Sequence, residues 1–184
     1  MSKALILIDI QNDYFPGGTM ELSGPLEAGK NAAQVLALFR DKGWPVFHVQ
    51  HLAARPGATF FLPGTPGADI HELVAPAPGE AVVVKHFPNS FRDTSLGQGL
   101  KAAGATQLTV CGMMTHMCVD ATVRAAFDLG FAVTVAHDAC ATRELSFGGA
   151  SIPAAQVHGA FLAALGAVYA KVAGTEEYLK EAGA

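Results

Sequence analysis

The sequence predicts a three-layer α/β/α sandwich with a central, mostly parallel six-stranded sheet, in a single domain that covers residues 1–184. Three observations favour this fold class. Short aliphatic runs alternate along the chain with segments of helical period. Most of these runs are apolar at consecutive positions, as expected for strands that helices cover on both sides. The chain has 184 residues, of which 51% are apolar and 15% charged, so it can bury one sizeable core.

Six runs are the predicted strands, and the last of them is the weakest. The strands are expected at 4–10, 45–51, 81–86, 107–112, 131–138 and 167–172. Helices are expected between them at 26–42, 94–103, 116–129 and 152–165. Thr94 is the expected N-cap of the second helix, and Gly43, Gly130 and Gly166 are the expected ends of the other three. The alternation indicates right-handed crossovers between parallel strands.

Residues 52–80 interrupt this regular pattern. They are rich in Pro, Gly and Ala and show little period. A loop of this length inside a compact domain is usually functional, so we expect a lid or a wall of a binding pocket.

Charge and cysteine usage limit the classes of partner and the compartment. The net charge is −4, and the 12 Lys and Arg residues are scattered, which excludes a basic footprint for nucleic acid or an anionic membrane. A small-molecule substrate is the expected partner. Three cysteines, an odd number, indicate reduced thiols. No signal peptide and no run of roughly 20 apolar residues is present, so we expect a cytoplasmic protein.

Three chemically active side chains fall at the ends of predicted strands. Asp9 ends the first strand, Lys85 ends the third, and Cys118 begins the helix after the fourth. In open α/β sheets the ligand crevice lies beyond the carboxyl ends of the strands, near the point where strand order reverses. We therefore expect a carboxylate, an ammonium and a thiol to meet at one edge of the sheet.

Cys118 has two interpretations. If Thr115 is the N-cap, Cys118 lies in the first helical turn, where the helix dipole stabilises a thiolate and a nearby lysine lowers its pKa further. Alternatively, Cys118 is buried packing, as free cysteines often are. Packing is the better interpretation for Cys111 and Cys140, which lack this placement.

The other two groups also have ordinary alternatives. Asp9 interrupts an aliphatic run, where it either exchanges protons with a nucleophile or caps the loop at 11–18. Lys85 follows three valines and either extends to solvent or is held at the crevice.

No metal or cofactor site is expected. His48 and His51 form an H-x-x-H pair, but side chains three apart on a strand point to opposite faces and cannot share an ion. The chain has no G-x-G-x-x-G after its first strand and no G-x-x-x-x-G-K-[ST], so dinucleotide and phosphate-loop sites are not predicted.

Nearly the whole chain resembles the isochorismatase-like cysteine hydrolases, the family of nicotinamidases, N-carbamoylsarcosine amidohydrolase and streptothricin hydrolase. Three stretches carry the resemblance: "ALILIDIQNDYF" (4–15), "VVVKHFPNSFRDTSL" (82–96) and "LTVCGMMTHMCVDATVRAAFDLGFAVTVAHDACATR" (108–143). The resemblance implies the isochorismatase-like, Rossmann-like version of the predicted fold. It also implies a homo-oligomer, either a dimer or a tetramer.

The resemblance assigns roles to particular residues. It implies a catalytic triad of Asp9, Lys85 and Cys118, and a cis peptide bond between Met113 and Met114. The amides of Met114 and Cys118 would form an oxyanion hole. Tyr14 and Phe91 match positions that often form the pocket wall in this family. The other expected substrate-binding residues are His51, Phe60 and Phe61, on or near the long loop, and His116, just before the nucleophile. Alternatively, the aromatic residues belong to the core or to an oligomer interface.

The implied activity is hydrolysis of a C–N bond in a small amide, lactam or ureido compound through a thioester. Two differences from known subgroups narrow the expected substrate. Nicotinamidases carry a D-x-H metal-binding stretch after the second strand, which "HVQHLAARPG" (48–57) lacks, so nicotinamide hydrolysis and a bound divalent metal are not expected. Isochorismatases that cleave a vinyl ether generally lack the cysteine, so its presence favours amide or ureido hydrolysis. The alternatives are a vinyl-ether hydrolase that uses Asp9 and Lys85 alone, and a non-catalytic member of the same fold.

Overall fold

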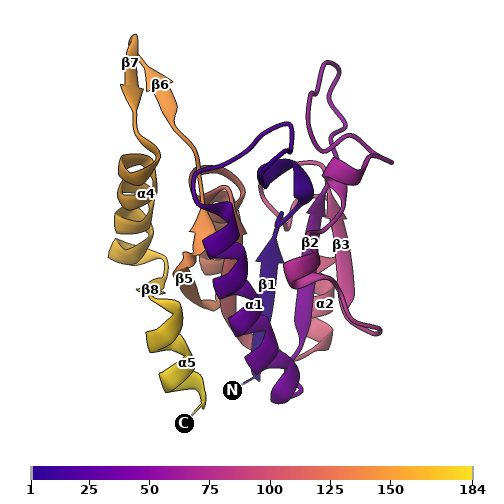
Figure 1. Cartoon of the computed structure of the whole chain (residues 1–184). Helices are drawn as coiled ribbons and strands as arrows, with labels where there is room; N and C mark the ends of the chain where they lie inside the picture. Colours follow the sequence, from indigo (N-terminus) through magenta and orange to yellow (C-terminus); the bar gives the residue numbers. More distant parts are fainter. Residues whose placement is uncertain (1, 184) are drawn as a thin grey trace.

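The computed structural model describes residues 2–183, and a sheet of six parallel strands lies at its centre (Figure 1). The strands are β1 (Ser2–Ile8), β2 (Val46–His51), β3 (Ala81–Lys85), β4 (Ala105–Met113), β5 (Ala132–Ala141) and β8 (Lys171–Ala173). Their spatial order is β3-β2-β1-β4-β5-β8, and each neighbouring pair is parallel. The predicted fold class is confirmed.

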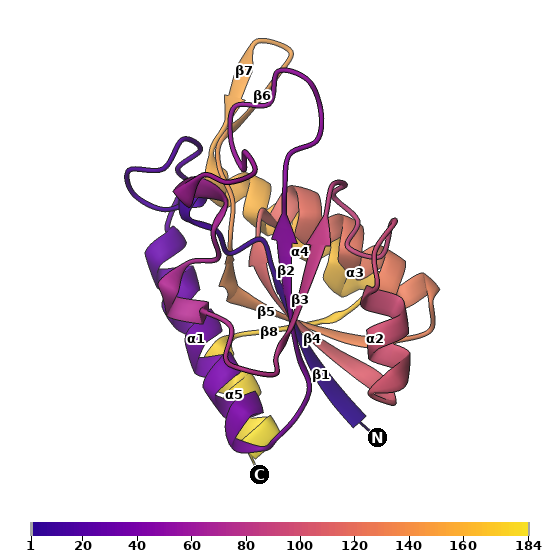
Figure 2. The same ribbon diagram turned by 90° about the vertical axis from the view of Figure 1, so that its right-hand side faces the viewer.

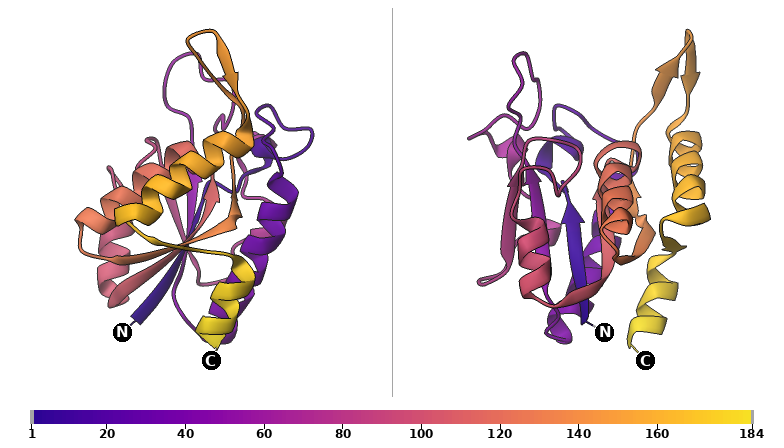
Figure 3. Two further views of the ribbon diagram at one scale, coloured as in Figure 1. Left: turned by 90° about the vertical axis from the view of Figure 1, so that its left-hand side faces the viewer. Right: turned by 180° about the vertical axis from the view of Figure 1, so that it is seen from behind.

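Helices cover both faces of this sheet, as Figures 2 and 3 show. One layer holds α1 (Pro25–Asp41) and α5 (Thr175–Gly183), and the other holds α2 (Leu96–Ala102), α3 (Asp120–Asp128) and α4 (Ala154–Val168). A hydrophobic core lies on each face of the sheet, and strand β1 contributes side chains to both cores because its side chains alternate between the two faces. Leu5 and Leu7 pack in the α1 core, whereas Ile6 and Ile8 pack in the core beneath α2, α3 and α4.

The last helix and strand differ from the prediction. Helix α4 continues through Gly166 to Val168, and the final strand begins at Lys171 instead of 167. A Cβ on Gly166 would make only an ordinary van der Waals contact with the Val172 side chain, at 3.4 Å, so this glycine neither ends the helix nor is required for its packing. The second helix starts later than expected, with Ser95 and not Thr94 at the N-cap position. Helix α5 was not predicted.

Two segments rise above the carboxyl ends of the strands (Figure 1). One is an unpredicted antiparallel hairpin of β6 (Leu145–Phe147) and β7 (Ala150–Ile152), joined by two glycines with positive φ. The other is the long connection from β2 to β3, which contains two 3₁₀ turns, η2 (Pro66–Ala68) and η3 (Glu72–Val74). No described helix is long and apolar enough to cross a membrane.

An ionic cluster fixes the end of the β2–β3 connection. The Glu80 carboxylate accepts hydrogen bonds from Arg40 Nε at 2.7 Å, from the Ala77 amide at 2.8 Å and from His48 Nε2 at 2.8 Å. These bonds outweigh the opposing effect of burial and lower the pKa of Glu80 to about 2, with the Arg40 guanidinium as the largest cause. The cluster ties the connection to α1 and to β2, beneath the site described below.

The Glu80 cluster predicts a specific loss of stability in acid. Because the pKa of Glu80 is lower in the folded chain, its stabilisation is complete above the unfolded value near 4.5 and is lost as the pH falls toward 2. The free energy of unfolding, measured with urea, should fall by roughly 3 kcal/mol more between pH 5 and pH 2 in the wild type than in Glu80→Gln. Equal losses in the two proteins would contradict the assignment.

Candidate active site

The candidate site lies where the order of the strands reverses. Strand β1 lies between β2 and β4, and the carboxyl ends of these strands open a crevice at that point. Asp9 follows β1 directly and has φ +51°, a conformation that non-glycine residues adopt rarely. Backbone strain of the kind that Asp9 shows is commonly found at functional sites. His51 ends β2 and pairs in register with Lys85, which ends β3.

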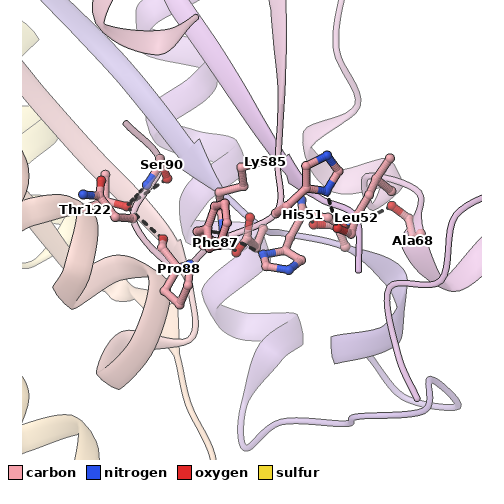
Figure 4. A network of polar contacts seen from close by, with 12 residues as sticks. His51, Leu52, Ala68, Lys85, Phe87, Pro88, Ser90 and Thr122 are labelled. Carbon is pink, nitrogen blue, oxygen red and sulfur yellow. Dashed lines mark hydrogen bonds and ion pairs between the residues drawn. The ribbon is translucent and has the colours of Figure 1, made fainter. Parts of the chain in front are cut away.

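Asp9 and Lys85 form a fully buried ion pair. Lys85 Nζ lies 2.7 Å from Asp9 Oδ2, and neither side chain is exposed. The same ammonium also lies 3.0 Å from His51 Nδ1 and 3.1 Å from the Phe87 carbonyl oxygen (Figure 4). Burial favours the neutral amine, but Asp9 and Cys118 outweigh it and raise the pKa of Lys85. Lys85 therefore does not extend to solvent, and Asp9 pairs with it.

Cys118 comes from a single π-helical turn that precedes α3. This turn, η4 (Thr115–Val119), follows β4, and the Val119 amide donates to the Met114 carbonyl five residues back at 3.3 Å. The prediction that Thr115 caps the helix was wrong. Its hydroxyl instead donates to the Ala141 carbonyl at 3.2 Å and contacts His158 Nδ1, so β5 and α4 hold it. Met114 occupies the N-cap position, and the peptide bond from Met113 to Met114 is cis.

The surroundings of Cys118 favour the protonated thiol. Burial is the largest cause that raises the pKa of this group, and the Asp9 carboxylate adds to it, while Lys85 acts in the opposite direction. Of the two interpretations of Cys118, the burial of the residue, which is 6% exposed, favours a protonated thiol over a thiolate that the helix terminus stabilises. Cys118 Sγ, a carboxylate oxygen of Asp9 and a ring nitrogen of His51 lie within 4.8 Å of one another. The thiol thus has a carboxylate base beside it.

A pocket of about 180 Å³ opens directly over the sulfur. Its walls come mainly from the β2–β3 connection, the residues after β3 and the turn that holds Cys118. The lining residues are Tyr14, His51, Ala53, Ala54, Arg55, Ala58, Phe60, Phe61, His86, Pro88, Met114, Met117 and Cys118. Mostly apolar walls with a few polar groups are typical of small-molecule sites. Arg55 brings a positive charge to this lining, and none of the lining residues is acidic.

Two of the predicted wall residues lie elsewhere. The Phe91 ring stacks on Phe131 with centroids 6.2 Å apart, at the edge of the core beneath α2 and α3. His116 contacts the Thr142 hydroxyl and packs edge-on against Phe161 of α4. The sequence around Phe91 and the position of His116 two residues before Cys118 did not determine which way these two side chains point. Neither residue lines the pocket, and we no longer expect them to bind substrate.

The two remaining cysteines are packing residues, and the two histidines of the H-x-x-H pair have separate partners. Cys111 is fully buried, and Cys140 donates to the Ala136 carbonyl at 3.4 Å. Cys140 lies inside β5, which is longer than predicted. His48 bonds Glu80 whereas His51 bonds Lys85, so the two rings point to different partners, as the strand period predicted.

Two polar residues that the sequence analysis did not single out hold the pocket wall in place. Gln11 Nε2 donates to the carbonyls of His51 at 2.9 Å and Ala68 at 2.7 Å, and its Oε1 accepts from the His51 amide at 2.7 Å. Asp13 Oδ2 accepts from the Phe61 amide at 2.6 Å. Their signal was available, because both lie within "DIQNDYF", polar residues directly after a buried strand.

Asp13 should affect substrate affinity more than its distance from the sulfur suggests. Asp13→Asn replaces one of the two carboxylate oxygens with an amide donor, which then faces either the Phe61 amide or the Thr19 hydroxyl, so the wall segment is expected to move. We expect KM for the best amide substrate to rise about tenfold. Asp69→Asn, an exposed change on the same connection, is the matched control and should leave KM unchanged. Equal KM values for both variants would contradict this role.

The three potential metal ligands Asp9, His51 and Cys118 are close enough to share an ion. Lys85 argues against this use, because its ammonium already lies between Asp9 and His51 and repels a second cation. The residues present thus fit an ammonium better than a divalent metal. Metal independence stays a prediction, which elemental analysis of the purified protein tests; stoichiometric zinc would contradict it.

Comparisons with known proteins agree with this geometry. A model of the isochorismatase domain matches residues 3–177. An isochorismatase family protein of Bacillus subtilis is 53% identical over 98% of this chain and its own full length. Streptothricin hydrolase of Streptomyces noursei is 41% identical over 78% of this chain, which spans about half (51%) of that protein. Maleamate amidohydrolase of Pseudomonas putida is 32% identical, with 76% and 72% covered. The crystal structure described as that of an isochorismatase hydrolase from Oleispira antarctica superposes with a TM-score of 0.94. It is 52% identical and covers 97% of this chain and 96% of its own.

Proposed function

Because this chain belongs to the isochorismatase family of hydrolases, we propose that it is a cysteine-dependent hydrolase that cleaves a C–N bond in a small amide, lactam or ureido compound. One observation carries the proposal: the Cys118 thiol lines a pocket, and the buried ion pair of the Asp9 carboxylate and the Lys85 ammonium lies next to that thiol. Nucleophile and base within reach of each other are the signature of covalent catalysis. Relatives named as amidohydrolases give further support.

In the first half-reaction, Asp9 takes the proton from the Cys118 thiol as the sulfur attacks the substrate carbonyl. The raised pKa of Cys118 requires such a base at neutral pH. The amides of Met114 and Cys118 stabilise the oxyanion, each by roughly 3 kcal/mol. Asp9 then passes the proton to the departing nitrogen, and the C–N bond breaks to leave a thioester.

In the second half-reaction, water attacks the thioester, with Asp9 again as the base. The products are a carboxylic acid and the restored Cys118 thiol. Lys85 holds the Asp9 carboxylate in place, and its positive charge balances the negative charge that passes between oxygen and sulfur. These three groups are strongly coupled, so their protons belong to the cluster and not to single residues.

The test is a screen of primary amides, N-carbamoyl compounds and lactams for release of ammonia or amine. Since no acidic side chain lines the pocket, neutral and anionic amides come first. Cys118→Ala should abolish release, whereas Cys140→Ala, equally buried but outside this pocket, should retain it. Mass spectrometry of a slowly hydrolysed substrate should show the acyl group on Cys118.

The same variants separate the alternatives. A vinyl-ether hydrolase that uses Asp9 and Lys85 alone would keep its activity in Cys118→Ala. A non-catalytic member of the fold would hydrolyse none of the compounds and would not label Cys118 with a carbonyl-directed electrophile. Either result would overturn the proposal.

We further propose that the chain acts in the cytoplasm as a homo-oligomer. Its three cysteines are free, which supports a reducing compartment. Exposed apolar side chains on the edge strand β3 and the hairpin support self-association, namely Val82, Val84 and Phe147. Light scattering of the purified protein at micromolar concentration tests the second point, and a monomer would contradict it.

A further inference from the structure

His51 contacts the catalytic ion pair with one ring nitrogen and leaves the other unused. Its Nδ1 lies 3.0 Å from Lys85 Nζ, at the end of β2. Gln11 bonds the backbone of His51 on both sides, so the position of the residue is fixed independently of its ring. The mechanism proposed above assigns no step to this side chain.

The contact with Lys85 determines where the His51 proton lies. An ammonium group only donates hydrogen bonds, so Nδ1 must accept and carries no hydrogen. A neutral imidazole has one hydrogen, which is then on Nε2. Burial first, and the charge of Lys85 second, lower the pKa of His51 to about 4, so the ring is neutral at physiological pH.

The Nε2–H group is accessible from the pocket. Within residues 2–183, His51 Nε2 has no hydrogen-bond partner, and it is not among the side-chain atoms that are both fully buried and unpaired. His51 is only partly buried and lines the cavity over Cys118. A donor without a protein partner thus lies on the wall of the pocket that Cys118 also lines, where most of the other lining residues are alanine, phenylalanine and methionine.

We propose that His51 binds the substrate through Nε2–H, and that it selects amides with a hydrogen-bond acceptor, such as a second carbonyl or a carboxylate, close to the scissile carbonyl. The inference rests on the proposed amide hydrolysis at Cys118. Lys85 has two tasks in this arrangement: it pairs with Asp9, and it fixes the tautomer of the residue that binds the substrate. His51 itself neither gains nor loses a proton in the reaction.

Two conservative variants separate a substrate contact from a purely structural role. In His51→Gln the side-chain amide can place a donor near the position of Nε2, whereas in His51→Asn the shorter amide can only replace Nδ1 as the acceptor for Lys85. We expect His51→Phe and His51→Asn to raise KM about tenfold for a substrate that has the second acceptor. His51→Gln should stay within about threefold of the wild type.

A matched pair of substrates sharpens the comparison. Succinamic acid has a second acceptor, whereas butyramide has the same chain length and lacks it. The loss in His51→Phe should appear with succinamic acid and be absent with butyramide. Rescue by His51→Asn instead of His51→Gln, or equal losses with both compounds, would overturn the proposal and assign His51 a role through Lys85 alone.

A measurement that needs no turnover distinguishes failure of this inference from failure of the proposed function. NMR of the Cys118→Ala protein with ¹⁵N-labelled histidine should show His51 as the Nε2–H tautomer between pH 6 and pH 9. Succinamic acid should shift its Nε2 resonance. The Nδ1–H tautomer, or an unchanged resonance at saturating succinamic acid, would refute the inference even if the wild type hydrolyses amides. The expected shift in Cys118→Ala, together with a wild type that hydrolyses no amide, would refute only the proposed function.

Discussion

Asp9→Asn is expected to abolish amide hydrolysis and, separately, to destabilise the fold. The substitution removes the carboxylate that lies beside the Cys118 thiol, so kcat should fall at least about 10³-fold. It also leaves the Lys85 ammonium without its partner in a position with no exposure to water. Removing one partner of a buried pair costs roughly 3–5 kcal/mol, which urea unfolding measures.

The double variant Asp9→Asn, Lys85→Met separates these two effects. Methionine has a similar shape to lysine without the charge, so the free energy of unfolding should recover most of the loss. Activity should not recover, because the base is still absent. Recovery of turnover in the double variant would show that Asp9 acts only by neutralising Lys85.

Asp93→Asn is the matched control for the single variant. Asp93 has φ +55°, close to the +51° of Asp9, so asparagine meets the same backbone demand at both positions. The Asp93 side chain is exposed and 3.8 Å from its neighbour Arg92. This variant should change neither activity nor stability, and a loss comparable to that of Asp9→Asn would contradict the assignment.

The placement of the catalytic groups could be predicted from the sequence because it follows from topology. Parallel strands end at one edge of a sheet, so Asp9 and Lys85 were expected at the same edge once the strands were identified. Their direct contact was not determined by topology, because β2 lies between β1 and β3 and the two side chains meet across its end. The protonation state of Cys118 was not determined by topology either, because the raised pKa depends on how completely neighbouring side chains exclude water from the sulfur.

Local rules failed where tertiary contacts overrode them. Gly166 has the character of a helix end, but it lies inside α4, which continues to Val168 and packs on β8. The π turn at Thr115–Val119 depends on partners in β5 and α4 that no window around the nucleophile contains. The hairpin was different, since Gly148 and Gly149 between two β-like triplets are a recognisable two-residue turn.

Gly112→Ala should cause a large loss of stability at the centre of the sheet. Gly112 has φ +148°, and a Cβ there would overlap the carbonyl oxygen of Ile8 and lie 2.8 Å from its Cβ and from its amide nitrogen. Those atoms belong to β1, which pairs with β4 at this point. Backbone atoms cannot rotate away, so the two central strands must separate. We expect a loss of at least about 4 kcal/mol.

The clash at Gly112 should also displace the catalytic groups, because Ile8 precedes Asp9 and Gly112 precedes the turn that carries Cys118. Any Gly112→Ala protein that folds should therefore have reduced kcat, as carboxylate and sulfur move apart. Gly104→Ala is the control, with φ +64° and open space around the new methyl group, and should cost only about 1 kcal/mol. Urea unfolding of both variants gives the comparison. Similar costs would mean that strands β1 and β4 can shift without loss, and that the close approach of their backbones does not position Asp9 against Cys118.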